Sequence, residues 1–371
     1  MNGKNLYIGV MSGTSLDAAD AIVASFSQTK IQCLEHQQTP IAPDLQQTIL
    51  TLCKPGPNEI EKLASADNQL AELYTLTITN LLKKAKLKPT DIRAIGLHGQ
   101  TIRHLPELGN TIQIGNPNLV ALKTQIPTVF DVRRKNMASG GQGAPLAPAF
   151  HQTLFHTPKS DRIIVNIGGI ANISCIPKNG SGHYGFDTGP GNLLMNEWIH
   201  QHLQQQYDDQ GQWAASGNVI PELLKRFLEH PYFEVLPPKS TGRESFNLKW
   251  LEKTIKETNQ LYTPQNIQCT LAHLTAETIS RGIQQTNITD GELIVCGGGA
   301  KNKFVMSLLA EKLAPNFCVN PSDKLGINSQ HIEALMMAWL AKLRIEETPV
   351  DLKSTTGSFR NTVLGSLYTP Q

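Results

Sequence analysis

The stretch LYIGVMSGTSLDAADAIVASF, residues 6–26, indicates how this chain folds. Apolar and small residues fill its beginning, 6–10, and its end, 18–26, as expected for two β-strands joined by a tight loop. The loop, 11–17, contains glycine, hydroxyl and carboxylate residues. Glycine lets a backbone turn sharply and approach a ligand closely, so this strand–loop–strand unit is a candidate binding element as well as a fold element.

Strands and helical segments alternate along the rest of the chain. Asn58 is placed to cap a helix over about 59–86, which Pro89 ends, and a short buried strand is expected at 94–97. Later segments repeat the alternation, with strands expected at 163–167 and 293–296 and helices at 193–206, 271–285 and 302–313. Strands that alternate with helices imply an α/β fold.

The composition excludes several functional classes. A length of 371 residues suggests two domains, and 40% hydrophobic with 17% charged residues is typical of a globular protein. A formal net charge of +2 provides no electrostatic basis for a nucleic-acid or membrane-surface partner. The N-terminus lacks a signal-peptide pattern, and no apolar run approaches the ~20 residues that span a bilayer. We therefore expect no nucleic-acid and no membrane partner.

The six cysteines are dispersed and include no CxxC pair. This pattern argues against a disulfide framework and against a zinc site. A cytoplasmic location is expected.

Three glycine loops follow short apolar strands, at 11–20, 166–172 and 296–302. Glycine-rich turns direct backbone N–H groups at anions, and Asp17 with Asp20 in the first loop suits a hydrated magnesium ion. A single loop of this kind is usually only a turn, but three at the carboxyl ends of strands favour a nucleotide site.

The known nucleotide motifs are missing. Lys301 follows glycines but precedes Asn302, so there is no GxxxxGK[ST], and the chain contains no GxGxxG, HRD or DFG. What remains is ATP held by hairpin loops between two domains. The segments IIVNIGGIAN (163–172) and LIVCGGGAKN (293–302) also resemble each other, which hints at an internal duplication.

The segment GFDTGPGN, 185–192, contains an isolated acid, Asp187, beside a turn rich in glycine. Its local sequence leaves two interpretations open, because aspartate is common in turns and helix caps and is also a common catalytic base. The helix expected after it would lower the pKa of Asp187, whereas burial would raise it. The sequence does not decide between these effects.

Nine motifs together carry a family resemblance. In chain order they are IGVMSGTSLDAAD, GLHGQTIRH, GGQGAPLAP, VNIGGIANIS, GFDTGPGN, STGRESFN, VCGGGAKN, GINSQHIEALMMAWLA and TTGSFRNTVLGSLY. In this order, over nearly the whole chain, they resemble the anhydro-N-acetylmuramic acid kinases. The resemblance implies an α/β fold of two related actin/hexokinase-like (ribonuclease H-like) domains that flank a cleft for ATP and substrate. We expect the domains at 1–130 plus about 338–371 and at 131–337, with hinges near 125–135 and 330–340.

The resemblance also implies an activity and partners. ATP and water convert 1,6-anhydro-N-acetylmuramic acid into N-acetylmuramic acid 6-phosphate in cell-wall recycling, with ATP and Mg²⁺ as cofactors, in a cytoplasmic homodimer. Oxygen 6 of this sugar is tied to carbon 1, so the sugar offers no 6-hydroxyl group. We therefore expect Asp187 to activate water rather than a hydroxyl group.

Site residues follow from the resemblance motif by motif. Asp187 falls on the catalytic aspartate. ATP-binding positions are expected at Gly13, Thr14, Ser15, Leu16, Asp17, Ala18, Ala19, Asp20, Gly168, Gly169, Gly297, Gly298, Gly299 and Asn302. Sugar-binding positions are expected at His98, Gln100, Arg133, Thr188 and Glu333, with Asp17 and Asp20 as metal ligands through water.

The chain departs from the family pattern at four positions. Ala18 stands where glycine is usual, and Asn136, Asn196 and Asn266 stand where acids are usual. The amides weaken any expectation that these positions pair with arginines. Two other functions remain open at this point: a hydrolase that pairs Asp187 with Glu333 without ATP, and an ATP- or sugar-binding regulator.

Overall fold

The computed structural model describes residues 5–13, 16–27 and 30–371. Contacts divide the chain into two compact units, Met1–Phe150 with His331–Gln371, and His151–Gln330. The border falls inside helix α5 (Ala147–Phe155), 20 residues beyond the expected border at 130. The intervening segment belongs to the first unit because its Asn136 and Gln142 both bond to Thr356 near the C-terminus.

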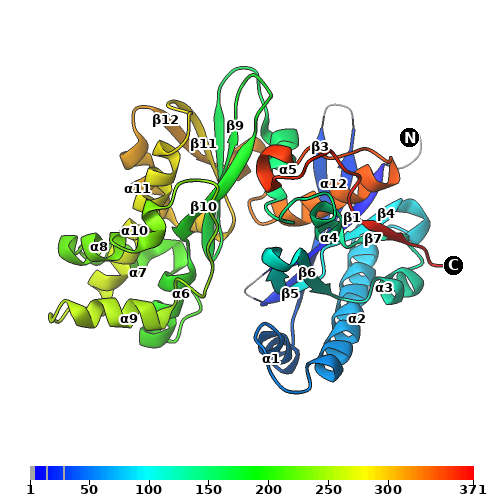
Figure 1. Ribbon diagram of the computed structural model, residues 1–371, viewed down its shortest axis with the longest axis horizontal. Helices are drawn as coiled ribbons and strands as arrows, with labels where there is room; N and C mark the ends of the chain where they lie inside the picture. The colour runs from blue at the N-terminus through cyan, green and yellow to red at the C-terminus, as the bar shows by residue number, and fades with distance from the viewer. Residues whose placement is uncertain (1–4, 14–15, 28–29) are drawn as a thin grey trace. The chain divides into compact units, whose positions relative to one another are not determined.

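The first unit contains a six-stranded sheet in the order β13-β7-β4-β1-β2-β3. Figure 1 labels β1, β3, β4 and β7 of this sheet. Its strands are β1 (Leu6–Ser12), β2 (Ala18–Phe26), β3 (Ile31–Pro40), β4 (Ala94–Leu97), β7 (Thr128–Phe130) and β13 (Ser366–Tyr368). A separate hairpin is formed by β5 (Gln100–Leu105) and β6 (Asn110–Ile114). The helices are α1 (Pro43–Leu52), α2 (Glu59–Ala85), α3 (Pro117–Thr124), α4 (Val132–Met137), α12 (Ile332–Ile345) and α13 (Lys353–Thr356).

Helix α12 lies directly on β1 and β4, and two glycines allow this contact. A Cβ atom at Gly9 would overlap the backbone of Ala334, and one at Gly96 would overlap the backbone of Met337. The neighbours of Gly9 in β1, Ile8 and Val10, point to the other face and join the core under α2. Helix α12 therefore covers one face of the sheet and α2 the other.

The second unit contains a five-stranded sheet in the order β10-β9-β8-β11-β12. Its strands are β8 (Arg162–Ile167), β9 (Ile170–Ile176), β10 (Tyr184–Pro190), β11 (Gly291–Cys296) and β12 (Phe317–Pro321). Its helices are α6 (Leu193–Leu203), α7 (Gln212–Ala215), α8 (Pro221–Leu228), α9 (Leu248–Glu257), α10 (Pro264–Gln284) and α11 (Lys303–Leu313).

Both sheets follow one plan. In each sheet, three consecutive strands pair antiparallel. A fourth strand then pairs parallel with the first, and a fifth pairs parallel with the fourth, which gives the spatial order 3-2-1-4-5. In the first unit, β13 extends this order by one strand. This shared order confirms the expected pair of related α/β domains. The sequence echo, however, was not evidence for it. Segments 163–172 and 293–302 both lie in the second unit, on the neighbouring parallel strands β8 and β11.

Most expected elements are present, with revealing differences at their ends. Asn58 does not cap α2 with its side chain, since its backbone is left-handed at φ 54°. Helix α10 begins seven residues before the expected 271, because Thr263 caps it and Pro264 occupies its first turn. Strand β3 was not expected, since its polar residues form an exposed edge.

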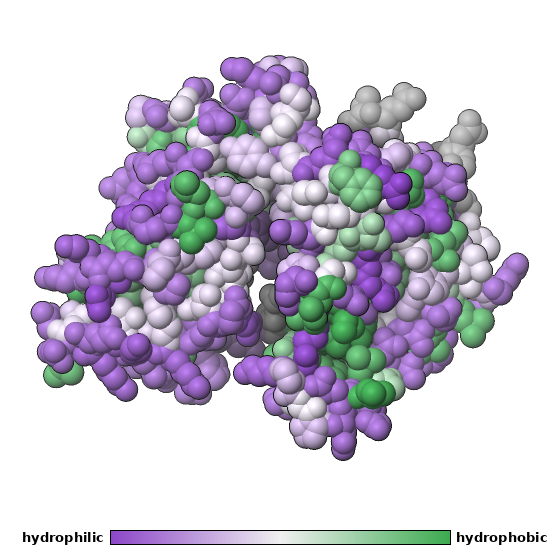
Figure 2. Space-filling model, viewed as in Figure 1, coloured by the Kyte–Doolittle hydropathy of each residue, from purple (hydrophilic) through white to green (hydrophobic). Residues whose placement is uncertain are grey.

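Each unit has its own buried apolar core. The face seen in Figure 2 is accordingly mostly hydrophilic, with apolar patches of limited extent. Among the described residues, no helix is long and apolar enough to cross a membrane.

Candidate active site

Asp187 lies in β10, the edge strand of the second sheet. A β-bulge follows it, because Asp187 pairs with Asn172 and Gly189 pairs with Ala171, which leaves Thr188 as the extra residue. Thr188 contacts Gly282 of α10, and a Cβ atom at Gly189 would also meet α10. Asp187 pairs with Asn172 on the face away from this helix. Phe186 and Thr188, on either side of Asp187, both lie next to Gly282 of α10, so strand alternation turns Asp187 away from the core.

A neighbouring loop holds Asp187 at three points. The Thr241 N–H donates to Asp187 Oδ2 at 3.0 Å, and the Tyr232 hydroxyl donates to the Asp187 carbonyl at 2.6 Å. The Asp187 N–H donates to the Lys239 carbonyl at 3.3 Å. Burial raises the pKa of Asp187 to about 6, against the lowering effect of the Thr241 N–H, and Glu244 raises it further. Desolvation therefore outweighs the stabilising contacts, and the carboxyl is poised as a base near neutral pH.

The second glycine loop is the turn between β8 and β9. Its Gly168 and Gly169 carbonyls accept hydrogen bonds from the N–H groups of Asn192 (2.8 Å) and Leu193 (3.1 Å). The segment that follows Asp187 is therefore anchored to this turn. Asn192 also donates from its side chain to the Ile167 carbonyl at 2.9 Å.

The glycines of these loops divide into two groups by the space around them. A Cβ atom at Gly297 or Gly299 would overlap Ile167, so these glycines are explained by packing. At Gly168 and Gly169 a Cβ atom would meet nothing nearer than 3.5 and 3.8 Å, and at Gly298 nothing nearer than 3.6 Å. The fold itself does not require glycine at these last three positions. The absence of a side chain at these three glycines fits a ligand that approaches the backbone closely.

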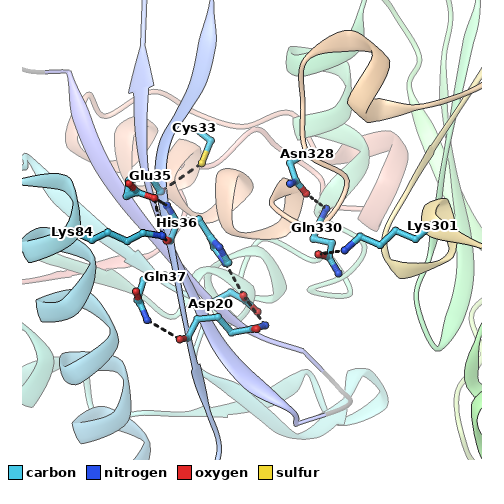
Figure 3. Close-up of polar contacts among 10 residues, drawn as sticks. Asp20, Cys33, Glu35, His36, Gln37, Lys84, Lys301, Asn328 and Gln330 are labelled. Carbon is cyan, nitrogen blue, oxygen red and sulfur yellow. Dashed lines mark hydrogen bonds and ion pairs between the residues drawn. The ribbon is translucent and has the colours of Figure 1, made fainter. Parts of the chain in front are cut away.

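Asn302 has a structural role. It is buried and its Oδ1 accepts the Val305 N–H at 3.0 Å, so it caps α11. Lys301 beside it donates to Gln330 Oε1 at 2.7 Å (Figure 3). An ATP contact by Asn302 stays a prediction.

The first glycine loop joins β1 to β2. Thr14 and Ser15 lie outside the described residues. Leu16 has a left-handed backbone, φ 59°, and its side chain is buried in the core of the first unit. The Ala18 and Ala19 side chains are buried as well, so only the backbone of these residues is available to a nucleotide.

The two expected metal ligands differ in their surroundings. Asp17 is exposed, whereas Asp20 Oδ1 accepts from His36 Nε2 at 2.9 Å and from Gln38 Nε2 at 3.1 Å (Figure 3). Both hydrogen bonds go to Oδ1, so the other carboxylate oxygen, Oδ2, accepts neither of them. The described residues include no cluster of three or more His, Cys, Asp or Glu side chains. Two carboxylates fit Mg²⁺, which in kinases takes its other ligands from phosphates and water.

His98 and Arg133, 35 residues apart, come together in the first unit. Arg133 Nε donates to His98 Nε2 at 3.0 Å, and Arg133 Nη1 donates to the Gly143 carbonyl at 2.9 Å. Burial, and secondarily Arg133, lowers the pKa of His98 to about 3, so the imidazole is neutral. Its Nδ1 then donates to the Gly99 carbonyl at 2.7 Å. His98 thus holds Arg133 in place, and Arg133 Nη2 points to no partner among the described residues.

Glu333 lies in the first turn of α12, and its charge acts on Arg133. Gln100 is buried and accepts from Ser12 Oγ at 2.8 Å, which links the β5–β6 hairpin to the end of β1. Thr188 is also buried, and its hydroxyl donates to the Ala171 carbonyl at 3.2 Å. The structure thus explains Gln100 and Thr188 by the fold. Sugar contacts by either one stay predictions.

Two of the three amides that replace family acids are structural. Asn136 is buried, donates to Thr356 Oγ1 at 2.9 Å and accepts the Gly143 N–H at 2.8 Å. Asn266 Oδ1 accepts the Asn218 N–H at 2.9 Å. A carboxylate oxygen can fill either acceptor role, but at 136 it could not donate to Thr356 Oγ1, whose own proton goes to the Leu352 carbonyl. The N–H of Asn196 donates to the Asn192 carbonyl, and its side chain has no hydrogen bond to another described residue.

Sequence reasoning missed the loop that holds Asp187. Tyr232 and Lys239 had no motif signal of their own, and STGRESFN was noticed only as part of the family pattern. The Lys239 ammonium lies 5.0 Å from the centre of the Tyr232 ring. No local pattern indicates that a residue 45 positions beyond Asp187 bonds to its carbonyl.

Comparison with known proteins identifies the family. The model of the family "AnmK: Anhydro-N-acetylmuramic acid kinase" matches residues 5–370. The chain belongs to this family. An anhydro-N-acetylmuramic acid kinase of Shewanella sp. (strain MR-4) is 45% identical over 367 residues, 98% of this chain and 99% of the relative. The enzyme of Shewanella frigidimarina is 43% identical over 370 residues, 99% of each.

Solved structures are similar at lower identity. The activator of 2-hydroxyisocaproyl-CoA dehydratase from Clostridium difficile, with bound ADPNP, has a TM-score of 0.49 and 12% identity, over 92% of this chain and 96% of that one. A ROK family glucokinase from Streptomyces griseus has a TM-score of 0.42 and 13% identity, over 91% and 99%.

Membership in the anhydro-N-acetylmuramic acid kinase family confirms the resemblance, the enzyme class and the use of ATP. The ATP-free hydrolase and the non-enzymatic regulator are no longer needed to explain the motifs. The individual site residues stay predictions.

Proposed function

We propose that this kinase opens the 1,6-anhydro ring with water and phosphorylates oxygen 6, with Asp187 as the base. The single observation that carries the proposal is the state of Asp187. It is a half-buried carboxyl whose pKa is raised to about 6, in the strand that leads into the turn anchored to Gly168 and Gly169. A base must be ionised at working pH yet still accept a proton, and a pKa near 6 satisfies both needs.

Ring opening by water precedes phosphoryl transfer. Asp187 takes one proton from water, whose oxygen forms a bond to carbon 1. The bond between carbon 1 and oxygen 6 breaks, and its electron pair stays on oxygen 6. Oxygen 6 then attacks the γ-phosphorus in line, and the bond from phosphorus to ADP breaks. The products are N-acetylmuramic acid 6-phosphate, ADP and the proton on Asp187, which is released to solvent.

The chain supplies position and charge for these steps. The N–H groups of the glycine turn suit the transferring phosphoryl group. Mg²⁺ neutralises phosphate charge when it is bound, and Asp17 and Asp20 would hold it. Arg133, fixed by His98 and Gly143, suits the lactyl carboxylate of the muramic acid, since its Nη2 can donate a charge-assisted hydrogen bond to a carboxylate.

The proposal also includes a homodimer in the cytoplasm, which the family resemblance implies. Sedimentation of the purified protein tests the homodimer, and fractionation of cells tests the location.

A labelling experiment tests the reaction. The protein is incubated with ATP, Mg²⁺ and the anhydro sugar in water enriched in ¹⁸O, and the product is reduced at once with borohydride to prevent exchange at carbon 1. We expect a product heavier by one phosphate and one water, with the label on carbon 1. Unlabelled product kept in the same water for the same time measures exchange. Label on the phosphate would refute ring opening by water, and a product without phosphate would refute the kinase.

A further inference from the structure

Three polar residues form a row across the second sheet. Asp187 of β10 pairs with Asn172 of β9, and Asn172 pairs with Asn166 of β8. Directly paired residues of antiparallel strands point to the same face, with Cβ atoms about 4.5–5.5 Å apart. Asn172 therefore lies between the proposed base and the strand that leads into the Gly168–Gly169 turn.

Asn172 has no structural explanation of its own. It is partly exposed. Its side-chain amide has no hydrogen-bond partner among the residues that the structure describes, 5–13, 16–27 and 30–371. By contrast, Ser174, which lies two residues further along β9 on the same face, is buried and its Oγ forms a hydrogen bond with His151 Nδ1 at 2.9 Å. Asparagine is disfavoured in strands, so neither strand formation nor packing calls for it at 172.

The chemistry places a developing charge where this amide lies. In the proposed reaction, Asp187 activates the water that attacks carbon 1, and the glycine turn holds the phosphoryl group. Oxygen 6 passes from carbon 1 to phosphorus between them, and it carries negative charge after it leaves carbon 1. Neighbouring strands are about 4.8 Å apart, so a donor on the middle strand reaches the space between these two groups.

We propose that Asn172 is a catalytic residue whose amide N–H donates a hydrogen bond to oxygen 6 as this oxygen leaves carbon 1. No covalent bond to Asn172 forms. The amide is a neutral donor fixed in place before the reaction, so it stabilises the charged oxygen without reorganisation. This inference rests on the proposed function.

Two substitutions and a control test the proposal. Asn172→Ala removes the donor, and kcat is expected to fall by about 10²–10³, as for other single donors to a reacting oxyanion. The Kd of a non-hydrolysable ATP analogue and the unfolding temperature are expected to stay as in the original chain. Asn287→Ala, at an exposed asparagine far along the chain, is expected to leave kcat unchanged. A normal kcat for Asn172→Ala overturns the proposal, and so does a loss that comes with lower unfolding temperature and weaker nucleotide binding.

Asn172→Asp tests the geometry independently. It removes the donor and places a like charge about 5 Å from Asp187, so the acidic limb of the kcat/KM profile is expected to move to higher pH. The other ionisable groups that act on Asp187 or are acted on by it, Glu244 and Tyr232, are the same in both proteins. An unmoved limb overturns the placement of Asn172 beside Asp187.

The ¹⁸O experiment separates the two levels of failure. If the original chain makes product labelled on carbon 1 and Asn172→Ala makes it at the same rate, only the role of Asn172 is refuted. If the original chain makes no such product, the proposed function itself is refuted.

Discussion

Asp187→Asn is expected to inactivate the enzyme and to stabilise its second unit. Asparagine has nearly the same shape, and its Oδ1 can still accept the Thr241 N–H, which lies 3.0 Å from the Asp187 carboxyl. It cannot take a proton from water, so turnover is expected to fall by about 10²–10⁴. The binding of ATP analogues is expected to persist.

The gain in stability follows from the pKa. Burial raises the pKa of Asp187 from 3.8 to about 6, so the folded chain binds this proton more tightly than the unfolded chain does. The ionised Asp187 carboxylate therefore lowers the free energy of unfolding, fully above pH 6 and progressively less as the pH falls toward 3.8. The pKa difference between the folded and unfolded chain corresponds to about 3 kcal/mol of unfolding free energy at pH 7.5 and to roughly half of that at pH 5.

Calorimetry and kinetics measure both effects. The unfolding temperature of Asp187→Asn is expected to exceed that of the original chain by several degrees at pH 7.5, at about 2–4 °C per kcal/mol for a unit of this size, and by less at pH 5. In the original chain kcat/KM is expected to fall about tenfold between pH 7.5 and 5, as the base becomes protonated. A destabilised variant, or a kcat/KM that stays flat to pH 5, would refute the reasoning.

Four further substitutions test other parts of the structure. Gly168→Ala is expected to weaken binding of an ATP analogue by about tenfold or more at unchanged unfolding temperature, since the fold leaves room for the methyl group. Gly299→Ala is expected to cost about 1–3 kcal/mol of stability, because its methyl group overlaps the packed Ile167 side chain. Similar melting curves for Gly168→Ala and Gly299→Ala would contradict the division of the glycines into these two groups. Arg133→Lys is expected to raise the KM for the sugar about tenfold with the KM for ATP unchanged, because a lysine cannot both keep the His98 and Gly143 contacts and donate to the carboxylate. Steady-state kinetics with each substrate varied measures both constants, and a shared rise in the two would contradict the expectation. Gly96→Ala is expected to lower the unfolding temperature, since helix α12 must move off β4 by about the radius of a methyl group. An unchanged unfolding temperature would show that α12 does not pack tightly on Gly96.

Local sequence patterns were reliable where the physics is local. Apolar periodicity placed α2 and β4, and proline and glycine marked their ends. The errors arose where backbone conformation or solvent exposure overrides the residue pattern. Asn58 was expected as a cap by its chemistry, but a left-handed backbone prevents its side chain from reaching the first turn. The polar strand β3 was missed because an exposed edge shows no apolar alternation.

The candidate site divides in the same way. Glycine loops and Asp187 were found from motifs, since a short segment carries the whole signal. The sequence could not decide whether burial or the helix terminus governs the pKa of Asp187. The structure decides for burial, because the first N–H groups of the following helical segment bond to Gly168 and Gly169, and partial burial of the carboxyl outweighs its bond from the Thr241 N–H.

The sequence by itself determined the α/β class, the three loops and the family, because these depend on composition, period and motif order. Only the tertiary structure decided which side chains meet. It paired Asp187 with Asn172 through strand register, turned Thr188 into the core through a bulge, and brought His98 to Arg133. Register and strand order are long-range properties, set by the packing of the sheet as a whole, and no segment of sequence contains them.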